Sequence, residues 1–567
     1  MKKLDLPGMD LTGLNLIEAS AGTGKTFNIT FLFLRLIVEA GLDVNQVLVV
    51  TFTEAATAEL RSELRERLKE ARRALASQGE SNDLMAQFVS SLDGRVEEAG
   101  ARIERALRDF DQASVSTIHG FCKRILEENA FECGTPFSVE LIGEQAPTYL
   151  DIARDYWARE TYNAPSVLVE ALNDAGVSPE SLADLVATTT SQPDLEVLTD
   201  ENKWNIDEFE RAFATAREIW LADREAIGDL VSESPALNRN KYRRGSLPGW
   251  IERVDRYFSH DEPRAVPDRL QTNGKSRDGV VAFSTRRLAD STKKGHEPPE
   301  HRFFGAGQDL LEAGAKMDGE IMAFKKRLID YAREELPARN ERMGVQSFDD
   351  LLHRLDRALR GPFGDRVVRE VSTRFRGVLI DEFQDTDRVQ YRIFKRLFGG
   401  GDVPLFLIGD PKQSIYAFRG GDIFTYLDAA GEPETKTFTL DVNWRSDPGL
   451  VRAVTELFGH VDNPFIYEKI DFPAVSPRVD SKDRARLGNE RPAPMQILFV
   501  RRDSRPTTGG KITKTWAVPG VADLVARDIA RLLEGDAIIE DRDRPEIAPL
   551  DIAVLVPQNR QALVVQD

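Results

Sequence analysis

The chain has 567 residues and a mass of 63.6 kDa, more than one hydrophobic core supports, so we expect several domains. Apolar residues make up 41% and charged residues 30%, which excludes collagen-like, low-complexity and wholly disordered proteins. The net charge of −18 repels a polyanion, so any contact with nucleic acid must be local. Because no apolar run has the length of a membrane span and no signal peptide is evident, we expect a cytoplasmic chain without membrane contact.

The first part of the chain, residues 1–145, alternates between strand and helix signals. Leu14 to Ala19 reads as an apolar strand, a glycine-rich turn follows, and Phe27 to Glu39 is typical of a buried helix. Residues 46–53 form a continuous β-branched run, as in parallel sheets that are covered on both faces. An amphipathic helix is predicted next by three leucines at four-residue spacing, Leu60, Leu64 and Leu68.

Residues 146–340 lose the strand signal and become helical and polar, which predicts a helical insertion. Two groups of basic residues reverse the acidic average there: Arg239, Lys241, Arg243 and Arg244, and then Lys275, Arg277, Arg286, Arg287, Lys293 and Lys294. A solvated helix face and a DNA-contacting face explain these groups about equally well.

Buried strands return after the insertion. Gly377 to Ile380 and Pro404 to Ile408 are apolar, so residues 341–445 are expected to complete the first domain. Two later apolar runs predict strands of a second domain over residues 446–567, namely Met495 to Val500 and Asp551 to Val556.

A phosphate-binding loop is predicted between the first strand and the first helix. It comprises Ala19, Ser20, Ala21, Gly22, Thr23, Gly24, Lys25 and Thr26, with alanine where the general P-loop pattern has glycine. Backbone N–H groups would hold the β- and γ-phosphates, Lys25 would neutralise their charge, and the Thr26 hydroxyl would ligate Mg²⁺. The alternative is a glycine-rich turn before a core helix.

An acidic pair closes the strand at Gly377 to Ile380. Asp381 can hold Mg²⁺ through its water shell, and Glu382 can orient or deprotonate an attacking water. Two surface acids at a strand end are the alternative, and the P-loop upstream in the same chain argues against it.

Several segments resemble, in order, the boxes of UvrD/Rep-like superfamily 1 helicases. They are Thr51 to Ala56, Thr117 to Phe121, Ser347 to Leu351, Asp381 to Asp387 (DEFQDTD), Gly409 to Gly420 (GDPKQSIYAFRG) and Asn443 to Ser446. The resemblance implies a P-loop NTPase of class α/β: a RecA-like parallel-sheet domain with a large helical insertion, followed by an incomplete second RecA-like domain.

The resemblance also implies residue roles. Gln413 would sense the γ-phosphate, Arg445 would stabilise the transition state, and Trp444 would offer a flat face to adenine. Contacts with DNA are implied for four residues, Thr53, Tyr416, Phe418 and Arg419, with the two rings stacking on unstacked bases. Core packing is the alternative for each aromatic ring.

Finer matches, such as Leu16 to Ser20 and Asp422 to Tyr426, resemble the RecB-type branch of this family. That branch implies an ATP- and Mg²⁺-dependent 3′-to-5′ helicase that acts on single-stranded and duplex DNA in double-strand-break repair, with RecC-like and RecD-like partners. The sequence ends at Asp567, before the later helicase boxes and a nuclease domain. The alternatives are a stand-alone UvrD-like repair helicase and a nucleotide- and DNA-binding fragment without motor activity.

Overall fold

The computed structural model describes most of the chain in two compact units. The described residues are 1–76, 83–134, 140–143, 145–190, 195–198, 204–264, 279–417, 420–503 and 505–566. One unit joins residues 1–135 to 351–567, and the other comprises residues 136–350. The expected insertion, residues 146–340, falls within the second unit, while the four-part domain division itself stays a prediction. Four residues discussed above lie outside the described ranges: Lys275, Arg277, Phe418 and Arg419.

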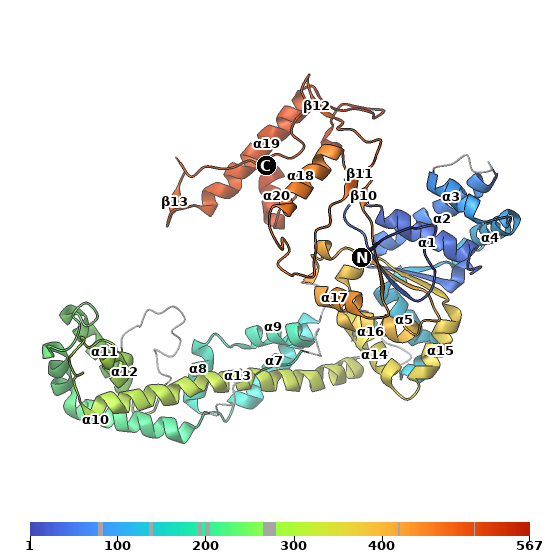
Figure 1. Cartoon of the computed structure of the whole chain (residues 1–567). Coiled ribbons are helices and arrows are strands. Elements are labelled where there is room, and N and C mark those ends of the chain that lie inside the picture. Colours follow the sequence, from blue (N-terminus) through green and yellow to red (C-terminus); the bar gives the residue numbers. More distant parts are fainter. Residues whose placement is uncertain are drawn as a thin grey trace. The chain divides into compact units, whose positions relative to one another are not determined.

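An all-parallel sheet of seven strands organises the first unit (Figure 1). The strand order is β1-β9-β2-β8-β7-β3-β4, and every neighbouring pair is parallel. The strand bounds are β1 Lys2–Lys3, β2 Leu14–Glu18, β3 Val47–Thr51, β4 Ser114–Thr117, β7 Gly377–Ile380, β8 Leu405–Gly409 and β9 Lys436–Thr439. The predicted α/β class with a parallel sheet is confirmed.

The central strands are buried on both faces, as their continuous apolar sequences predict. Every residue of β2, β3, β7 and β8 is buried. Alternate side chains point to opposite faces. On one face, Ile17, Val49 and Phe406 share a core with helices α1 (Lys25–Val38), α2 (Glu54–Ala76) and α4 (Val96–Arg108).

The opposite face is covered by α5 (Ile118–Glu128) and α16 (Arg388–Phe398). The Phe121 ring of α5 stacks on the Phe394 ring of α16 with their centroids 5.5 Å apart, and Phe375 joins them edge-on. The remaining helices of this part are α3 Asp83–Ser91, α6 Ala130–Cys133, α14 Phe348–Arg360, α15 Gly364–Arg374 and α17 Ile423–Gly431. The sheet is thus sandwiched between two helical layers.

The second unit is helical and has a core of its own. Its elements are β5 Glu140–Ile142, α7 Ala146–Thr161, α8 Ser166–Asp174, α9 Pro179–Thr190, α10 Ile206–Glu233, α11 Leu247–Phe258, α12 Thr285–Ala289, α13 Arg302–Met343 and β6 Val345–Ser347. Helix α13 has 42 residues, a length of about 60 Å at 1.5 Å per residue, and packs along α10 (Figure 1). Trp220 and Phe303 lie in this core with ring centroids 4.8 Å apart.

Residues 442–566 contain short strands and three helices among the described residues. Their bounds are β10 Val442–Asn443, α18 Pro448–Gly459, β11 Ser476–Pro477, β12 Ala485–Leu487, β13 Thr507–Thr508, β14 Lys511–Ile512, α19 Lys514–Glu534, β15 Ala537–Ile539 and α20 Asn559–Gln566. The strands predicted at 495–500 and 551–556 are wrong, because neither segment is in a strand. A strand needs a neighbour for its backbone N–H and C=O groups, and no described strand pairs with either segment. Phe499 and Leu555 are accordingly exposed.

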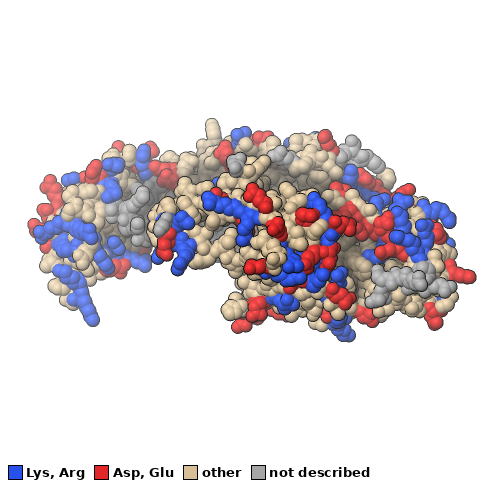
Figure 2. Space-filling model, turned by 90° about the horizontal axis from the view of Figure 1, so that it is seen from above, with Lys and Arg blue, Asp and Glu red and all other residues tan. Residues whose placement is uncertain are grey.

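The surface carries charges of both signs. On the face in Figure 2, Lys and Arg side chains are interspersed with Asp and Glu side chains, so no single sign of charge covers it. Among the helices in the described ranges, none combines the length and apolar character needed to cross a membrane.

Candidate nucleotide-binding site

The predicted site residues follow three neighbouring strands at one edge of the sheet. Strand β8 lies between β2 and β7, and all three are parallel. The P-loop follows β2, Asp381 and Glu382 follow β7, and the turn that carries Gln413 follows β8. Because the carboxyl ends of parallel strands meet at the same edge, these loops converge there.

The P-loop has the backbone geometry that its glycines allow. Gly22 and Gly24 have φ angles of 79° and 85°, in the left-handed region where a side chain is strained. A Cβ on Gly22 would also lie 2.8 Å from the Asn443 side chain, whose amide donates to the Ala21 carbonyl at 3.0 Å. Helix α1 begins at Lys25, so its first backbone N–H groups face the loop.

A pocket of about 320 Å³ brings most of the predicted residues together. It is lined by Ser20, Ala21, Gly22, Gly24, Lys25, Thr26, Phe27, Asp381, Glu382, Gln413, Trp444 and Arg445. Ala19 and Thr23 lie behind this lining. The Ala19 N–H donates to the Gly409 carbonyl at 2.9 Å, and the Thr23 hydroxyl donates to the Ser20 carbonyl at 2.7 Å, so both hold the loop in shape.

Lys25 and Glu382 form an ion pair inside this pocket. The Lys25 ammonium donates to Glu382 Oε2 at 2.6 Å, and the Gln384 amide donates to the same oxygen at 2.7 Å. Glu382 has a φ of 53°, which is uncommon for a residue with a side chain and typical of functional sites. The strand end therefore presents this carboxylate to the P-loop lysine.

Asp381 and Thr26 are the two predicted Mg²⁺ ligands. Desolvation, and then the negative charge of Glu382, raise the pKa of Asp381 to about 7, so a cation competes with a proton for this carboxylate. The Thr26 side chain is exposed on the pocket wall. Among the described residues no group of three or more His, Cys, Asp or Glu side chains could hold a metal ion. The pair Thr26 and Asp381 fits Mg²⁺, which takes one or two protein ligands together with phosphates and water.

Gln413, Trp444 and Arg445 complete the pocket. The Gln413 amide donates to Asp410 Oδ2 at 2.7 Å. The Trp444 backbone N–H donates to the Gly22 carbonyl at 2.8 Å, and 62% of Trp444 is exposed, so a flat ring is available beside the P-loop. Arg445 is exposed, and no ion pair holds its guanidinium within the described ranges. The pocket thus offers two cations, two acids and an aromatic face.

The residues predicted to contact DNA are only partly described. Tyr416 is half-buried, and its ring stacks on Phe52 with centroids 5.3 Å apart, next to the exposed Thr53. Phe418 and Arg419 lie outside the described residues. The structure thus brings Thr53 and Tyr416 to one surface, and their role in DNA binding stays a prediction.

The basic groups of the second unit are in part engaged in holding its fold. Arg239 donates to the Val231 and Ser234 carbonyls, Lys241 to the Asp290 carbonyl and Lys293 to the Pro235 carbonyl. Their contact with DNA stays a prediction.

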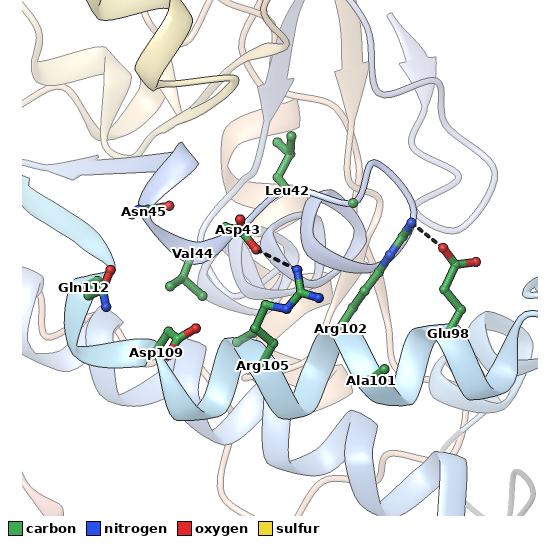
Figure 3. A pocket seen from close by; sticks show the side chains of 12 residues that line it. Leu42, Asp43, Val44, Asn45, Glu98, Ala101, Arg102, Arg105, Asp109 and Gln112 are labelled. Atoms are coloured by element: carbon green, nitrogen blue, oxygen red, sulfur yellow. Dashed lines mark hydrogen bonds and ion pairs between the residues drawn. The ribbon is translucent and has the colours of Figure 1, made fainter.

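A second pocket, of about 470 Å³, lies near the amino ends of β3 and β4 and is lined by none of the predicted residues (Figure 3). In it, the Arg102 side chain of α4 pairs with Glu98, and Arg105 pairs with Asp43 at 3.5 Å. The pocket therefore has a mixed lining with charges of both signs, away from the P-loop.

Sequence reasoning missed several residues that shape the site. Phe27 lines the pocket, Asn443 ties the tryptophan segment to the P-loop, and Gln384 joins Glu382 to the turn after β8. Asn443 and Gln384 stand inside the quoted boxes, beside residues that were given roles, and that proximity was the available signal. Their hydrogen bonds link segments that are distant in sequence, so spacing alone did not reveal them.

Replacing Lys25 with Ala is expected to weaken ATP binding ten- to a hundredfold. Lys25 is the cation of the P-loop, and a charge-assisted contact contributes roughly 1.5–3 kcal/mol. Isothermal titration calorimetry would measure the affinity. Lys395→Ala is a matched control, because Lys395 also pairs with a carboxylate, Glu432 at 2.6 Å, but does not line the pocket. Unchanged ATP affinity in the Lys25 variant would contradict the site.

The pH dependence of stability should report on Asp385. Desolvation, and then the charge of Glu382, raise the pKa of Asp385 from 3.8 to about 6. The folded state thus binds the proton more tightly than the unfolded state, and stability is lost as the pH rises from about 4 to 6. The Asp385→Asn variant lacks this loss. The free energy of unfolding of the variant minus that of the native chain should therefore be higher at pH 8 than at pH 4, by roughly 1–3 kcal/mol. Melting temperatures of both proteins check this, and a difference between variant and native chain that is the same at both pH values would count against it.

Comparisons with known proteins agree with this geometry. The family model described as UvrD/REP helicase N-terminal domain matches residues 7–434. The chain is 34% identical to the RecB subunit of the RecBCD enzyme from Escherichia coli (strain K12), covering 100% of this chain and 48% of that protein. The RecB subunit from Haemophilus influenzae is 31% identical over 99% of this chain and 48% of that protein, and one from Mycobacterium tuberculosis (strain ATCC 25618 / H37Rv) is 30% identical over 96% and 38%.

The chain therefore spans about half the length, or less, of these relatives. The family match implies that the parallel sheet and P-loop form a RecA-like nucleotide-binding fold. On the sequence match and the fold together, the chain belongs to the UvrD/REP helicase family and resembles its RecB subunits.

Proposed function

We propose that the chain is part of an ATP-dependent DNA helicase subunit that moves 3′ to 5′ on single-stranded DNA during double-strand-break processing and recombinational repair. The observation that carries this proposal is the pocket in which Lys25 and Glu382 meet at 2.6 Å beside Gln413, Trp444 and Arg445. A P-loop facing a strand-end acidic pair is the arrangement that nucleoside triphosphate hydrolysis requires.

The residues would divide the chemistry as follows. The N–H groups at the start of α1 and the Lys25 ammonium bind the phosphates, and Trp444 covers the base. Thr26 and Asp381 would hold Mg²⁺, which neutralises phosphate charge. Glu382 is released from Lys25 when phosphate oxygens replace it, and its carboxylate then orients the attacking water and takes its proton. Arg445 adds positive charge where negative charge develops in the transition state.

DNA would be held beyond the same edge of the sheet. Thr53 and Tyr416 lie there, and Phe418 and Arg419 continue the Tyr416 segment. Because stacking and backbone contacts tolerate any sequence, they suit a protein that moves along the strand. We propose RecC-like and RecD-like partner subunits, since the similar proteins are named as subunits of the RecBCD enzyme. We also propose duplex as well as single-stranded DNA as substrate, and a cytoplasmic location. A stand-alone UvrD-like repair helicase would lack those partners.

A second candidate function is nucleotide and DNA binding without motor activity by this chain alone. It is favoured by the exposed apolar side chains Ile497, Leu498, Phe499 and Leu555, in segments with no strand partner among the described residues. In that case the isolated chain binds Mg²⁺-ATP weakly, hydrolyses it very slowly and does not unwind a 3′-tailed duplex. Strand displacement by the isolated chain would exclude this candidate.

The chemistry is tested by Glu382→Gln in the complete motor subunit. Since Glu382 acts on water and competes with phosphate for Lys25, the variant should bind Mg²⁺-ATP at least as tightly as the native protein. DNA-stimulated turnover should fall by orders of magnitude. Calorimetry and a phosphate-release assay measure the two quantities. Retained turnover would contradict the assignment of Glu382 to water activation. A large loss of Mg²⁺-ATP affinity would instead indicate a metal-binding role for Glu382.

The DNA surface is tested by Tyr416→Ala. If the ring stacks on bases, single-strand affinity should fall by roughly 1–3 kcal/mol, about equally for oligo-dT and mixed sequences. Fluorescence anisotropy with labelled oligonucleotides measures it. Tyr162→Ala serves as the control, because Tyr162 is an exposed tyrosine that directly follows α7 in the other unit. A Tyr416 variant that melts early but binds DNA normally would favour core packing against Phe52.

A further inference from the structure

A buried group of charges lies behind the nucleotide pocket. The Lys412 ammonium lies between two carboxylates, pairing with Glu18 and with Asp410 Oδ1, the latter at 2.7 Å. The three side chains are 7%, 6% and 2% exposed. A lysine beside Gln413 in sequence would be a natural second cation for phosphate, but Lys412 does not line the pocket. Its charge is already neutralised by buried acids, so phosphate binding is not its role.

The sheet register explains why these charges meet. Glu18 ends β2 and is paired with Gly409 at the end of β8, and Asp410 and Lys412 follow directly. The same junction holds the start of the P-loop through the Ala19 N–H and the Gly409 carbonyl. A buried charge is costly unless it is paired and hydrogen-bonded, so the pairs restrict where Asp410 can lie.

Asp410 in turn fixes the Gln413 side chain. The Lys412 ammonium pairs with Oδ1 of Asp410 at 2.7 Å, and the Lys412 backbone N–H donates to the same oxygen at 3.1 Å. The other oxygen, Oδ2, is left to accept from the Gln413 amide at 2.7 Å. An ionised carboxylate only accepts hydrogen bonds, so the amide nitrogen of Gln413 must face Asp410. The orientation of Gln413 in the pocket is thereby set from behind.

The same aspartate is joined to the acidic pair of the site. The Asp410 backbone N–H donates to Gln384 Oε1 at 2.9 Å, and the Gln384 amide donates to Glu382. A Cβ on Gly409 would lie 2.6 Å from Gln384 Oε1, so the two loops touch closely. Asp410 is therefore held to the Gln384 loop by its backbone, while its carboxylate meets Lys412 and Gln413.

We propose that Lys412 is a positioning residue that holds Asp410 so that Gln413 distinguishes ATP from ADP. The inference rests on the proposed nucleotide function and assigns its selectivity for the terminal phosphate to a buried ion-pair group outside the pocket. Because Lys412 acts only through Gln413, its loss alters recognition of the γ-phosphate and leaves binding of the other phosphates intact.

The test compares affinities for AMP-PNP and ADP, each with Mg²⁺, by calorimetry. The native chain prefers AMP-PNP. Lys412→Met lowers that preference about tenfold, as Gln413→Ala does, while ADP affinity stays within twofold. The Lys412→Met/Gln413→Ala double variant shows no further loss, because both changes remove the same contact, that of Gln413 with the γ-phosphate. Lys395→Met, a carboxylate-paired lysine outside the pocket, leaves the preference unchanged.

Two further variants separate positioning from folding. Glu18→Gln retains the Lys412–Asp410 pair and should keep the preference, whereas general disruption of the buried group would lower it. If Lys412→Met fails to fold, Glu18→Gln/Lys412→Met restores the native net charge of the group, −1, and should lose the preference as a folded protein.

Four results would overturn the inference. A Lys412 variant that keeps the native preference shows that Lys412 does not act through Gln413. Equal loss of AMP-PNP and ADP affinity makes it a general phosphate or structural residue. A native chain without preference removes the role of Gln413 but leaves the site, whereas a native chain that binds neither nucleotide overturns the proposed function and this inference together.

Discussion

The ion pair between Lys25 and Glu382 joins residues 357 positions apart in sequence. The parallel sheet makes this pair possible, and the rest of the site depends on the same sheet. The two residues follow β2 and β7, which flank β8 in a parallel sheet. Parallel strands place their carboxyl ends at one edge, so the P-loop, the acidic pair and the Gln413 turn are brought together by strand order alone. Side chains then adjust the distances, Gly22 and Gly409 permit close approaches, and Gly22 and Gly24 adopt positive φ angles.

The same sheet accommodates a second unit between its strands in sequence. Strands β7 and β8 lie between β2 and β3 in the sheet, although residues 136–350 separate them from β4 along the chain. The second unit buries its own aromatic core, and β5 pairs in parallel with β6 near its two ends. A unit with its own core can therefore leave the register of the sheet undisturbed. Its basic residues in part serve this fold, since three of them bond backbone carbonyls.

The sequence was most informative where a local pattern determines a local structure. The P-loop, the buried strands and the acidic pair were predictable because glycine spacing, apolar runs and a strand end are all short-range features. The pairing of Lys25 with Glu382 and the burial of Lys412 were not, since each depends on which strands become neighbours. The predicted strands at 495–500 and 551–556 failed for a related reason: an apolar run records a preference for burial, but a strand also needs a partner for its backbone.

The pairing of charges within the site is compatible with the proposed binding of a polyanion. Lys25 is held by Glu382, and Asp381 carries a pKa near 7 because it is desolvated and lies beside that second acid. In the proposed nucleotide site, phosphate oxygens would offer Lys25 a stronger partner, and a divalent cation would offer Asp381 a better one than a proton. Each exchange would remove one of the two acids from its present contact, and Glu382 would become available to water only when phosphate had taken its lysine. The contact that stabilises Glu382 in this structure would then also make its release depend on bound nucleotide.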